Sequence, residues 1–413
     1  MAYINIHSVV TSPYTRSNSD DSGQQKSGVY GGVLRARESS QSNTRPCRDA
    51  MREYSVVGGV STSTVDYALN LAEMFVAADV PEDEAQELST TLFTSFINTS
   101  AAAIKAQDLA VATRAELDKM VAAEAPGVGV EVESLDLDSA TVTLSAKVTK
   151  ALEGAHRTWV KALEDADRKG ALMRLSPGQY QGLFEVGMAL RAGEDWVGDG
   201  AKLKNALLDA VSSNVSLDQA AFGRMFAAEN RFSIDAAVQV AHSLGVNELV
   251  QEWDFFTAMD DRRGRAGVMD VAGLASPIFY KYRSVNVDLL RHNLSQGCAD
   301  PVDDETLSQA LGVLTTVLST AAPQGASTSH GPQSLPSTVY LTVSNAPVTL
   351  AQAFLEPTES ASEAQERLLH TGRRLAAGYG GVHGEYLWSV FGDSTHDSVA
   401  EAIAAAVDQA VNR

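Results

Sequence analysis

Strand-like segments at the two ends of the chain flank a long helix-like region, and this arrangement limits the available folds more than any other feature. Tyr3–Val10 alternates apolar and polar residues, which is the period of a strand. β-Branched and aromatic residues recur at Pro277–Tyr282, Thr338–Val343 and Tyr386–Phe391, as is typical of strands. Ser61–Gly245 follows helical spacing instead. We therefore expect an α+β fold with a sheet built from both chain ends and a large helical insertion.

Apolar spacing and capping residues place the expected helices more closely. They are Arg45–Tyr54, Thr64–Ala77, a helix opening at Pro81, Ala101–Ala123, Lys147–Asp167, Pro177–Ala192, Lys202–Ser212, Leu217–Ala228, Ile234–Leu244, Glu305–Thr320, Glu363–Gly378 and Asp397–Val411. Gly129–Glu133 and Ala140–Leu144 indicate a small hairpin within the insertion. Thr11–Gly32 is polar and rich in turn residues, so we expect a long surface loop there. Val33–Glu38 then indicates a short extended piece.

The charge of the chain is uneven along its length. The 413 residues have a formal net charge of -20, yet residues 1–55 carry seven basic and five acidic side chains. That stretch is therefore +2 and the remainder is -22. Such a balance excludes a protein that coats polyanions with its whole surface. Any nucleic-acid contact is expected within the first 55 residues.

The compartment follows from two further observations. Two cysteines cannot build a disulfide scaffold or a four-thiolate zinc site, so we expect reduced thiols in a cytosolic protein. The N-terminus lacks the pattern of a signal peptide, and no apolar run is long enough to span a bilayer. We therefore expect a soluble cytoplasmic protein with no membrane partner.

Motifs for catalysis are missing from the sequence. There is no P-loop and no dinucleotide fingerprint, and the eight histidines are scattered without a metal-ligand spacing. The adjacent carboxylates Asp20–Asp21 and Asp260–Asp261 could hold a divalent metal, but on turn-like segments such pairs are more often capping or solubilising groups. We therefore expect no catalytic residue, no metal site, no cofactor and no enzyme activity.

Basic and hydrogen-bonding side chains gather in the N-terminal region. They are Lys26, Arg35, Arg37, Ser40, Gln41, Arg45, Arg48 and Arg52. The last three are spaced by three and four residues, which aligns them along one helix face. Together with the donors of the Ser39–Ser42 turn, such a row suits a series of phosphates. On composition alone a solvated helix face is favoured over this reading, because Asp49 and Glu53 can pair with the arginines.

Longer sequence motifs favour phosphate binding over a solvated helix face. In order, YINIHSVVTSP, NSDDSGQQKSGVYGGVLRARESSQS and RDAMR closely resemble the N-terminal signature of the CasC family, the crRNA-binding backbone subunit of the type I-E CRISPR Cascade complex. LSPGQYQGLFEVG, AAFGRMFAAENRFSIDAAVQVAHSLG and WDFFTAMDD resemble the central block of its longer bacterial members. SPIFYKYRSVNVDLLRHNL and LPSTVYLTVSNAPVTLAQAFLEP resemble the C-terminal strands. The resemblance covers nearly the whole chain in co-linear order.

The resemblance implies a fold and a division into domains. The implied architecture is an RNA-recognition-motif-like (ferredoxin-like) palm with a large helical insertion and a protruding thumb hairpin. Residues 1–60 would form the first part of the palm, 61–246 the helical insertion, 247–275 the thumb and 276–413 the rest of the palm. The thumb range has an apolar stem and basic residues near its tip, which suits an arm lying across a nucleic-acid duplex.

The resemblance also implies a function. Several copies would polymerise along one crRNA and present its spacer for pairing with a target DNA strand. Further partners would be the large, small, crRNA-processing and 5'-handle-binding Cascade subunits. The turn and basic helix would bind the guide backbone through Lys26, Ser40, Gln41 and the helix of Arg48. Thumb residues Phe256 and Thr257, with Met225 nearby, would lie beside a displaced base.

Alternatives remain at this point. Without the resemblance, ordinary core packing is the preferred reading of Phe256 and Met225. One alternative function is a type III-like backbone subunit in which Asp20 or Asp260 supports metal-dependent cleavage of target RNA. Another is a diverged interaction subunit that no longer binds RNA.

Three departures from the family pattern bear on the affinity for RNA. Asn43–Pro46 looks inserted before the basic helix, which leaves open whether Arg45 or Arg48 takes the phosphate-binding role. The family's basic loop corresponds to Gln324–Thr328, where the usual lysine is missing. The rest of the chain is strongly acidic. Weaker or more salt-sensitive RNA binding, or reliance on neighbouring subunits, is expected to follow.

Overall fold

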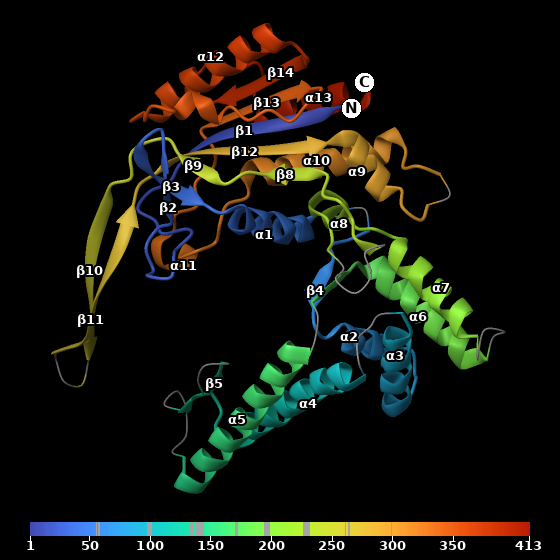
Figure 1. Cartoon of the computed structure of the whole chain (residues 1–413). Coiled ribbons are helices and arrows are strands. Elements are labelled where there is room, and N and C mark those ends of the chain that lie inside the picture. The colour runs from blue at the N-terminus through green and yellow to red at the C-terminus, as the bar shows by residue number, and fades with distance from the viewer. Residues whose placement is uncertain are drawn as a thin grey trace. The chain divides into compact units, whose positions relative to one another are not determined.

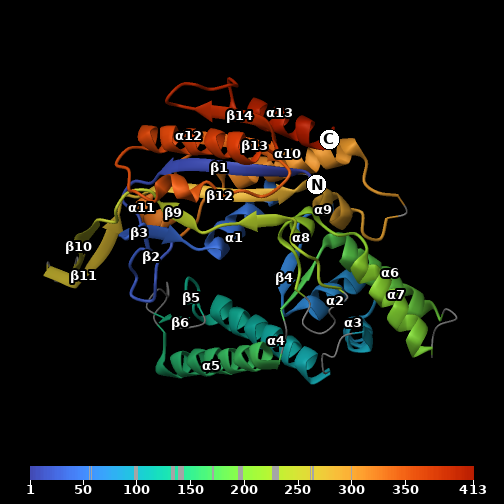
Figure 2. The same cartoon turned by 45° about the horizontal axis from the view of Figure 1, so that its top comes forward.

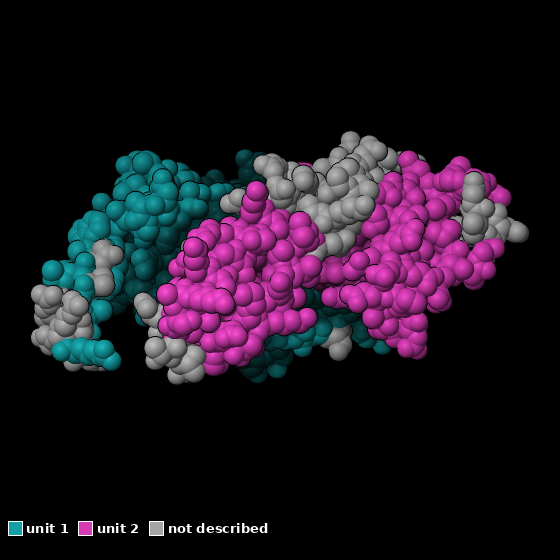
Figure 3. All heavy atoms as spheres, turned by 90° about the horizontal axis from the view of Figure 1, so that it is seen from below, with its two compact units in different colours: residues 1–60, 216–223, 234–413 teal, residues 61–215, 224–233 magenta. Residues whose placement is uncertain are grey.

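The computed structural model describes residues 1–54, 56, 58–96, 101–131, 135–137, 144–169, 172–193, 199–225, 232–260, 262, 265–298 and 300–413. The chain divides into two compact units, which Figure 3 distinguishes by colour. The first contains Met1–Val60, Ser216–Gly223 and Ile234–Arg413, and the second contains Ser61–Val215 and Arg224–Ser233. Residues 216–223 and 234–246, which we expected in the insertion, thus belong to the first unit. Within the described ranges, no helix is long and apolar enough to cross a bilayer.

An antiparallel sheet forms the centre of the first unit (Figure 1). In spatial order its strands are β14 (Val382–Ser389), β13 (Thr338–Ser344), β1 (Tyr3–Thr11), β12 (Ile278–Asn286), β9 (Ser243–Gly245), β3 (Val33–Glu38) and β2 (Ser27–Tyr30), and β8 (Val238–Val240) also pairs with β12. The first strand lies between two strands from the last third of the chain, with Ile6 opposite Arg283 on one side and Leu341 on the other. The α+β class and the assembly of the sheet from both chain ends are confirmed.

Helices cover both faces of this sheet (Figure 2). The helices of this unit are α1 (Ser40–Ala50), α8 (Leu217–Phe222), α9 (Val287–Leu294), α10 (Asp304–Thr320), α11 (Ser327–His330), α12 (Ala361–Tyr379) and α13 (Val399–Val411), with the 3-10 helices η1 (Met51–Glu53) and η4 (Ala351–Phe354). The face that carries Tyr340 packs against Leu368 of α12 and Phe354 of η4. Arg283, on the opposite face, donates to the carbonyl of Leu318 in α10. Because both faces are covered, Ile6 on one face of β1 and Val9 on the other are both fully buried.

The second unit is mainly helical. Its helices are α2 (Tyr67–Ala77), α3 (Glu82–Phe96), α4 (Ala101–Glu124), α5 (Ala146–Lys169), α6 (Pro177–Ala192) and α7 (Gly200–Ser212), and its short strand pairs are β4 (Thr62–Thr64) with β7 (Met173–Leu175) and β5 (Gly129–Val130) with β6 (Leu135–Asp136). Phe75, Phe93 and Leu183 belong to one core, and Leu117 and Trp159 to a separate core between α4 and α5. Residues 132–133 and 140–143 of the expected small hairpin lie outside the described residues.

A two-stranded hairpin extends away from the sheet of the first unit (Figure 1). It consists of β10 (Gln251–Asp260) and β11 (Arg265–Ala275), and the register places Phe255 opposite Val271. The expected tip residues Asp261, Arg263 and Gly264 lie outside the described residues.

Four sequence predictions are corrected. The helix expected over Arg45–Tyr54 begins at Ser40 instead, because Ser39 caps it by accepting a hydrogen bond from the Ser42 N–H. Pro46 therefore lies inside α1 rather than in its first turn. The loop expected over Thr11–Gly32 includes strand β2, because its last residues pair with β3.

The third correction concerns Ile234–Leu244. This segment forms β8 and β9 rather than a helix. Val240 pairs with Arg283 and Leu244 pairs with Tyr280, so hydrogen bonding to β12 outweighs the helical spacing. The preceding helix α8 ends at Phe222, because Gly223 takes a φ of 75° that ordinary side chains disfavour.

Candidate nucleic-acid interface

Lys26 and Arg37 lie next to each other where β2 and β3 pair. The Arg37 N–H donates to the Lys26 carbonyl at 2.8 Å, and both side chains are partly exposed. The Arg37 guanidinium donates to His242 Nδ1 at 2.8 Å. Two residues beyond Arg37 the chain reaches the N-cap of α1, so these basic groups precede a helix start directly.

The start of α1 supplies hydrogen-bond donors. A helix leaves its first N–H groups without partners inside the helix, and the Ser39 hydroxyl takes up only that of Ser42. The N–H groups of Ser40 and Gln41 are thus suited to an external acceptor such as a phosphate oxygen. Arg45 follows within the same helix and is exposed, although it pairs with Asp49 at 2.7 Å.

The helix does not present its three arginines as one exposed row. Arg48 points inward and donates to Asp218 Oδ2 at 2.6 Å, with only 12% of its side chain exposed. Its guanidinium also lies 5.0 Å from the centre of the Phe222 ring. Burial lowers the pKa of Arg48, and the Asp218 carboxylate opposes that shift. Arg52 lies beyond the end of α1, in η1. Arg48 therefore anchors α1 to α8.

Arg35 is also turned into the protein. Its Nη1 donates to the Val246 carbonyl at 2.5 Å, and its Nη2 donates to the Phe354 carbonyl at 3.2 Å. Only 1% of the residue is exposed, and burial lowers its pKa. The neighbouring turn is equally close-packed, since a Cβ on Gly31 would lie 1.8 Å from the Leu355 carbonyl oxygen. Arg35 thus ties β3 to the segments around it, and a phosphate cannot reach its buried guanidinium.

The expected base-displacing residues come from both units. Phe256 and Thr257 are neighbours on one strand, so their side chains lie on opposite faces of the hairpin. Met225 is 87% exposed and belongs to the second unit. The structure describes Phe256 and Thr257 as exposed positions of β10, which excludes the core-packing alternative for Phe256.

The two faces of the hairpin differ in character. On one face are exposed apolar side chains: Trp253, Phe255, Met269 and Val271. We call these four residues the apolar hairpin face. The other face carries the exposed residues Glu252, Asp254 and Phe256 in succession along β10. Carboxylates repel phosphates, so the apolar hairpin face is the better suited to meet nucleobases or a protein surface.

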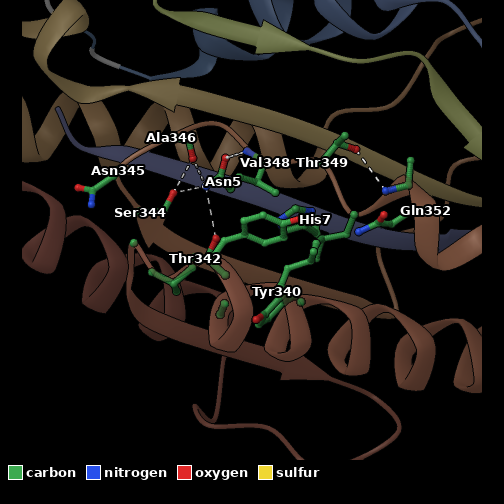
Figure 4. Close-up of a pocket in the computed structure, with 18 of the residues that line it drawn as sticks. Asn5, His7, Tyr340, Thr342, Ser344, Asn345, Ala346, Val348, Thr349 and Gln352 are labelled. Atoms are coloured by element: carbon green, nitrogen blue, oxygen red, sulfur yellow. Dashed lines mark hydrogen bonds between the residues drawn. The ribbon is translucent and has the colours of Figure 1, made fainter.

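A cavity of about 870 Å³ lies within the first unit, between the sheet and α12 (Figure 4). Asn5 organises its wall by donating to Ser344 Oγ at 2.7 Å and accepting from the Val348 N–H at 3.2 Å. His7 also lines it, and burial lowers the pKa of His7 to about 3, so the imidazole is neutral. None of the side chains that line the cavity is charged at neutral pH. It therefore does not suit phosphates, and the basic region around α1 remains the better candidate.

Asp20 is one of the adjacent carboxylates that the sequence favours as capping groups, and it forms hydrogen bonds within its own turn. Asp20 Oδ1 accepts from the Ser22 hydroxyl at 2.7 Å and from the Gln24 N–H at 2.9 Å, and these bonds lower the pKa of Asp20. It therefore closes its own turn. The side chain of Asp260 lies outside the described residues. Across the described ranges, no three His, Cys, Asp or Glu side chains form a group that could hold a metal.

Several residues that shape this region were not identified from the sequence. They are Asn18, Glu38, Asp218, His242 and Lys281, which partner the basic region or its supports. Of these residues, only Lys281 could have been recognised from the sequence pattern. A lysine within an otherwise aromatic and β-branched strand requires a buried partner.

Comparisons with known proteins agree with this fold. A family model described as CT1975-like protein matches residues 4–413. Two solved chains share the fold. One, described as "CRISPR RNA-guided surveillance complex, pre-nicking", has a TM-score of 0.71 and 21% identity, covering 99% of this chain and 100% of that chain. The other, described as "CRISPR RNA-guided surveillance complex", has a TM-score of 0.63 and 19% identity with the same coverage. No curated protein sequence matches the chain significantly.

Proposed function

The chain belongs to the CT1975-like protein family, and from this premise we propose that it is a backbone subunit of a CRISPR RNA-guided surveillance complex of the type I-E Cascade kind. The observation that carries the proposal is the whole-length likeness to chains of RNA-guided surveillance complexes. In this role copies of the chain polymerise head-to-tail along crRNA and present the spacer to a target DNA strand. The other Cascade subunits cap the open ends of this assembly.

In this proposal each structural unit takes the role of one part of the family architecture. The first unit acts as the RNA-recognition-motif-like palm, the second as the helical insertion, and the β10–β11 hairpin as the thumb. Guide phosphates bind Lys26, Arg37, the Ser40–Gln41 turn and Arg45, which are partly or fully exposed and lie before α1 or within it. Arg35 and Arg48 support the fold of that region through their buried contacts.

Co-purification tests the proposal. The chain is produced with its crRNA and complex partners, and bound nucleic acid is measured by absorbance and by sequencing of the extracted RNA. We expect guide-length RNA in the purified assembly. A folded chain that assembles with its partners but carries no guide RNA would contradict the proposed role and favour a diverged interaction subunit.

Replacing Phe255 and Val271 of the apolar hairpin face by serine should weaken assembly of several copies on one RNA. Both side chains are largely exposed, at 62% and 49%, so the change should cost the isolated chain little stability. In the assembly the same side chains would be buried, and each should lose about 1–2 kcal/mol of contact energy. Native mass spectrometry of the complex would report the number of copies bound.

The opposite face of the hairpin offers a matched control. Replacing Glu252 and Asp254 by serine changes two exposed residues of the same strand without touching the apolar hairpin face. This variant should assemble like the parent. If the two variants behave alike, the apolar hairpin face has no special part in assembly.

Incubation with Mg²⁺ or Mn²⁺ should leave both the guide and a complementary RNA intact. The Asp20 carboxylate already accepts hydrogen bonds from its own turn, which leaves it poorly placed to hold a catalytic metal. Denaturing gels of labelled RNA would check this result. Regular cleavage that disappears in Asp20→Ala or Asp260→Ala would establish the metal-dependent alternative.

A further inference from the structure

Three consecutive residues, the last two of β3 and the N-cap Ser39 after them, are each hydrogen-bonded to the polar loop that precedes β2. Gln25 Nε2 donates to the Arg37 carbonyl at 2.9 Å, and the Ser17 hydroxyl donates to Glu38 Oε1 at 2.9 Å. The Ser39 N–H donates to Asn18 Oδ1 at 2.8 Å. The loop is therefore fastened along the stretch that leads into α1.

The loop bonds also determine the place of Lys26. The Lys26 N–H donates to the Asn18 carbonyl at 2.8 Å, and the Asn18 side chain holds the Ser39 N–H. Lys26 and the first turn of α1 are thus connected through one residue. Moving the loop would move a proposed phosphate-binding lysine relative to the Ser40 and Gln41 donors.

Glu38 is the centre of this arrangement. Only 2% of the residue is exposed, and its second oxygen, Oε2, accepts from Ser243 Oγ at 2.7 Å and from Lys281 Nζ at 3.0 Å. Burial by itself would raise the pKa of Glu38, but the Lys281 charge and the hydrogen bonds hold it below its usual value. The carboxylate is therefore ionised at neutral pH, and its charge is compensated from inside the protein.

The same buried group reaches α1. Asn43 Nδ2 donates to Ser243 Oγ at 3.0 Å, and Arg283 Nη2 donates to Asn43 Oδ1 at 3.2 Å. One carboxylate thus connects the loop, the sheet and the first turn of the helix through Ser17, Ser243 and Asn43.

We propose that Glu38 is a positioning residue for RNA binding, whose buried carboxylate fixes the Lys26 loop and the start of α1 in one arrangement before RNA arrives. The inference rests on the proposed function, because it takes RNA as the ligand. Ordering a loop in advance removes its entropy cost from the binding step and so raises affinity without a direct contact. The negative charge does not repel phosphates, since it is buried and paired with Lys281.

Ser17→Ala tests this role with the smallest change. It removes the bond from the loop to Glu38 but leaves the Glu38–Lys281 ion pair in place. The full-length chain should then bind a single-stranded RNA oligonucleotide about 5-fold more weakly, as expected for one lost hydrogen bond of about 1 kcal/mol. The slope of log affinity against log salt should stay at the parent value, because no phosphate contact is lost. Ser17→Thr, which keeps the hydroxyl, should restore affinity.

Two controls separate positioning from other effects. Lys26→Ala should weaken binding and also reduce the salt slope by about 0.7, the value for one lost contact to a single strand. Ser319→Ala removes another buried serine hydroxyl, in α10, and should leave RNA affinity unchanged. If Lys26→Ala binds RNA with the parent's affinity and salt slope, the proposed function fails, whatever Ser17→Ala does.

The positioning role is overturned if Ser17→Ala binds RNA as tightly as the parent, or if its loss of affinity comes with a reduced salt slope. Hydrogen exchange in the RNA-free chain gives a second readout that does not depend on affinity. The Ser39 N–H, held by the loop, should exchange faster in Ser17→Ala than in the parent. Unchanged exchange at Ser39 would also overturn the proposal.

Discussion

Replacing Lys26, Arg37 and Arg45 together by alanine should abolish co-purification of guide RNA with a folded chain. These three side chains are accessible cations on β3, next to β2 and in α1, whereas Arg35 and Arg48 are buried in structural contacts and the exposed Arg52 lies beyond the end of α1. At roughly 1 kcal/mol for each exposed phosphate contact, RNA affinity should fall about 100-fold. The salt slope should fall by about 2, since each single-strand contact contributes about 0.7. Fluorescence anisotropy at several salt concentrations would measure both quantities.

A matched control removes the same number of charges elsewhere. Arg191, Lys202 and Lys204 are partly or fully exposed cations of the second unit, outside the proposed interface. Their triple alanine variant carries the same net charge and should keep most of its RNA affinity. Equal losses in the two variants would mean that overall charge, rather than this surface, determines binding.

Glu38→Gln should destabilise the chain by about 3–5 kcal/mol, because it leaves the buried Lys281 ammonium without its counter-charge. Adding Lys281→Met should recover most of that loss, since the double variant buries no unpaired charge. Urea denaturation followed by circular dichroism would compare the free energies of unfolding. A double variant as unstable as Glu38→Gln would show that the ion pair is not the source of the effect.

The same ion pair predicts how stability depends on pH. The pKa of folded Glu38 lies below its ordinary value, so its contribution is fully present above about pH 4.5. That contribution is lost as the pH falls through the folded pKa. The difference between the parent and the double variant should therefore be constant from pH 6 to 8 and should change only in acid.

The sequence was most informative where burial and periodicity coincide. The central strands β1, β12 and β13 appear close to their expected positions, because their apolar character leaves few other conformations. Helix α6 matches its prediction over Pro177–Ala192, where a capping box and a proline fix its start. Ile234–Leu244 could not be predicted locally, since only pairing with β12 makes it extended.

For the candidate site, the sequence indicates which residue types are present but not which way they point. Arg45 and Arg48 have similar local sequence, yet one is exposed and the other pairs with Asp218, about 170 residues away along the chain. Local sequence likewise does not distinguish the buried Arg35 from the partly exposed Arg37. Strand alternation alone places Glu252 and Asp254 on the same face as Phe256, but the opposing residue on β11, Asp270, follows only from the register.

The place of β1 in the sheet has a consequence for how the protein is made. Ile6 leaves the ribosome early, but its partner Leu341 is translated about 330 residues later. At roughly 5–20 residues per second, the first strand waits about 15–70 s for that neighbour. Such distant pairing gives the first unit a high contact order and slow folding, while the largely local contacts of α4 and α5 in the second unit can form during synthesis. A chain truncated before β13 would keep β1 as an open apolar edge and should aggregate rather than fold.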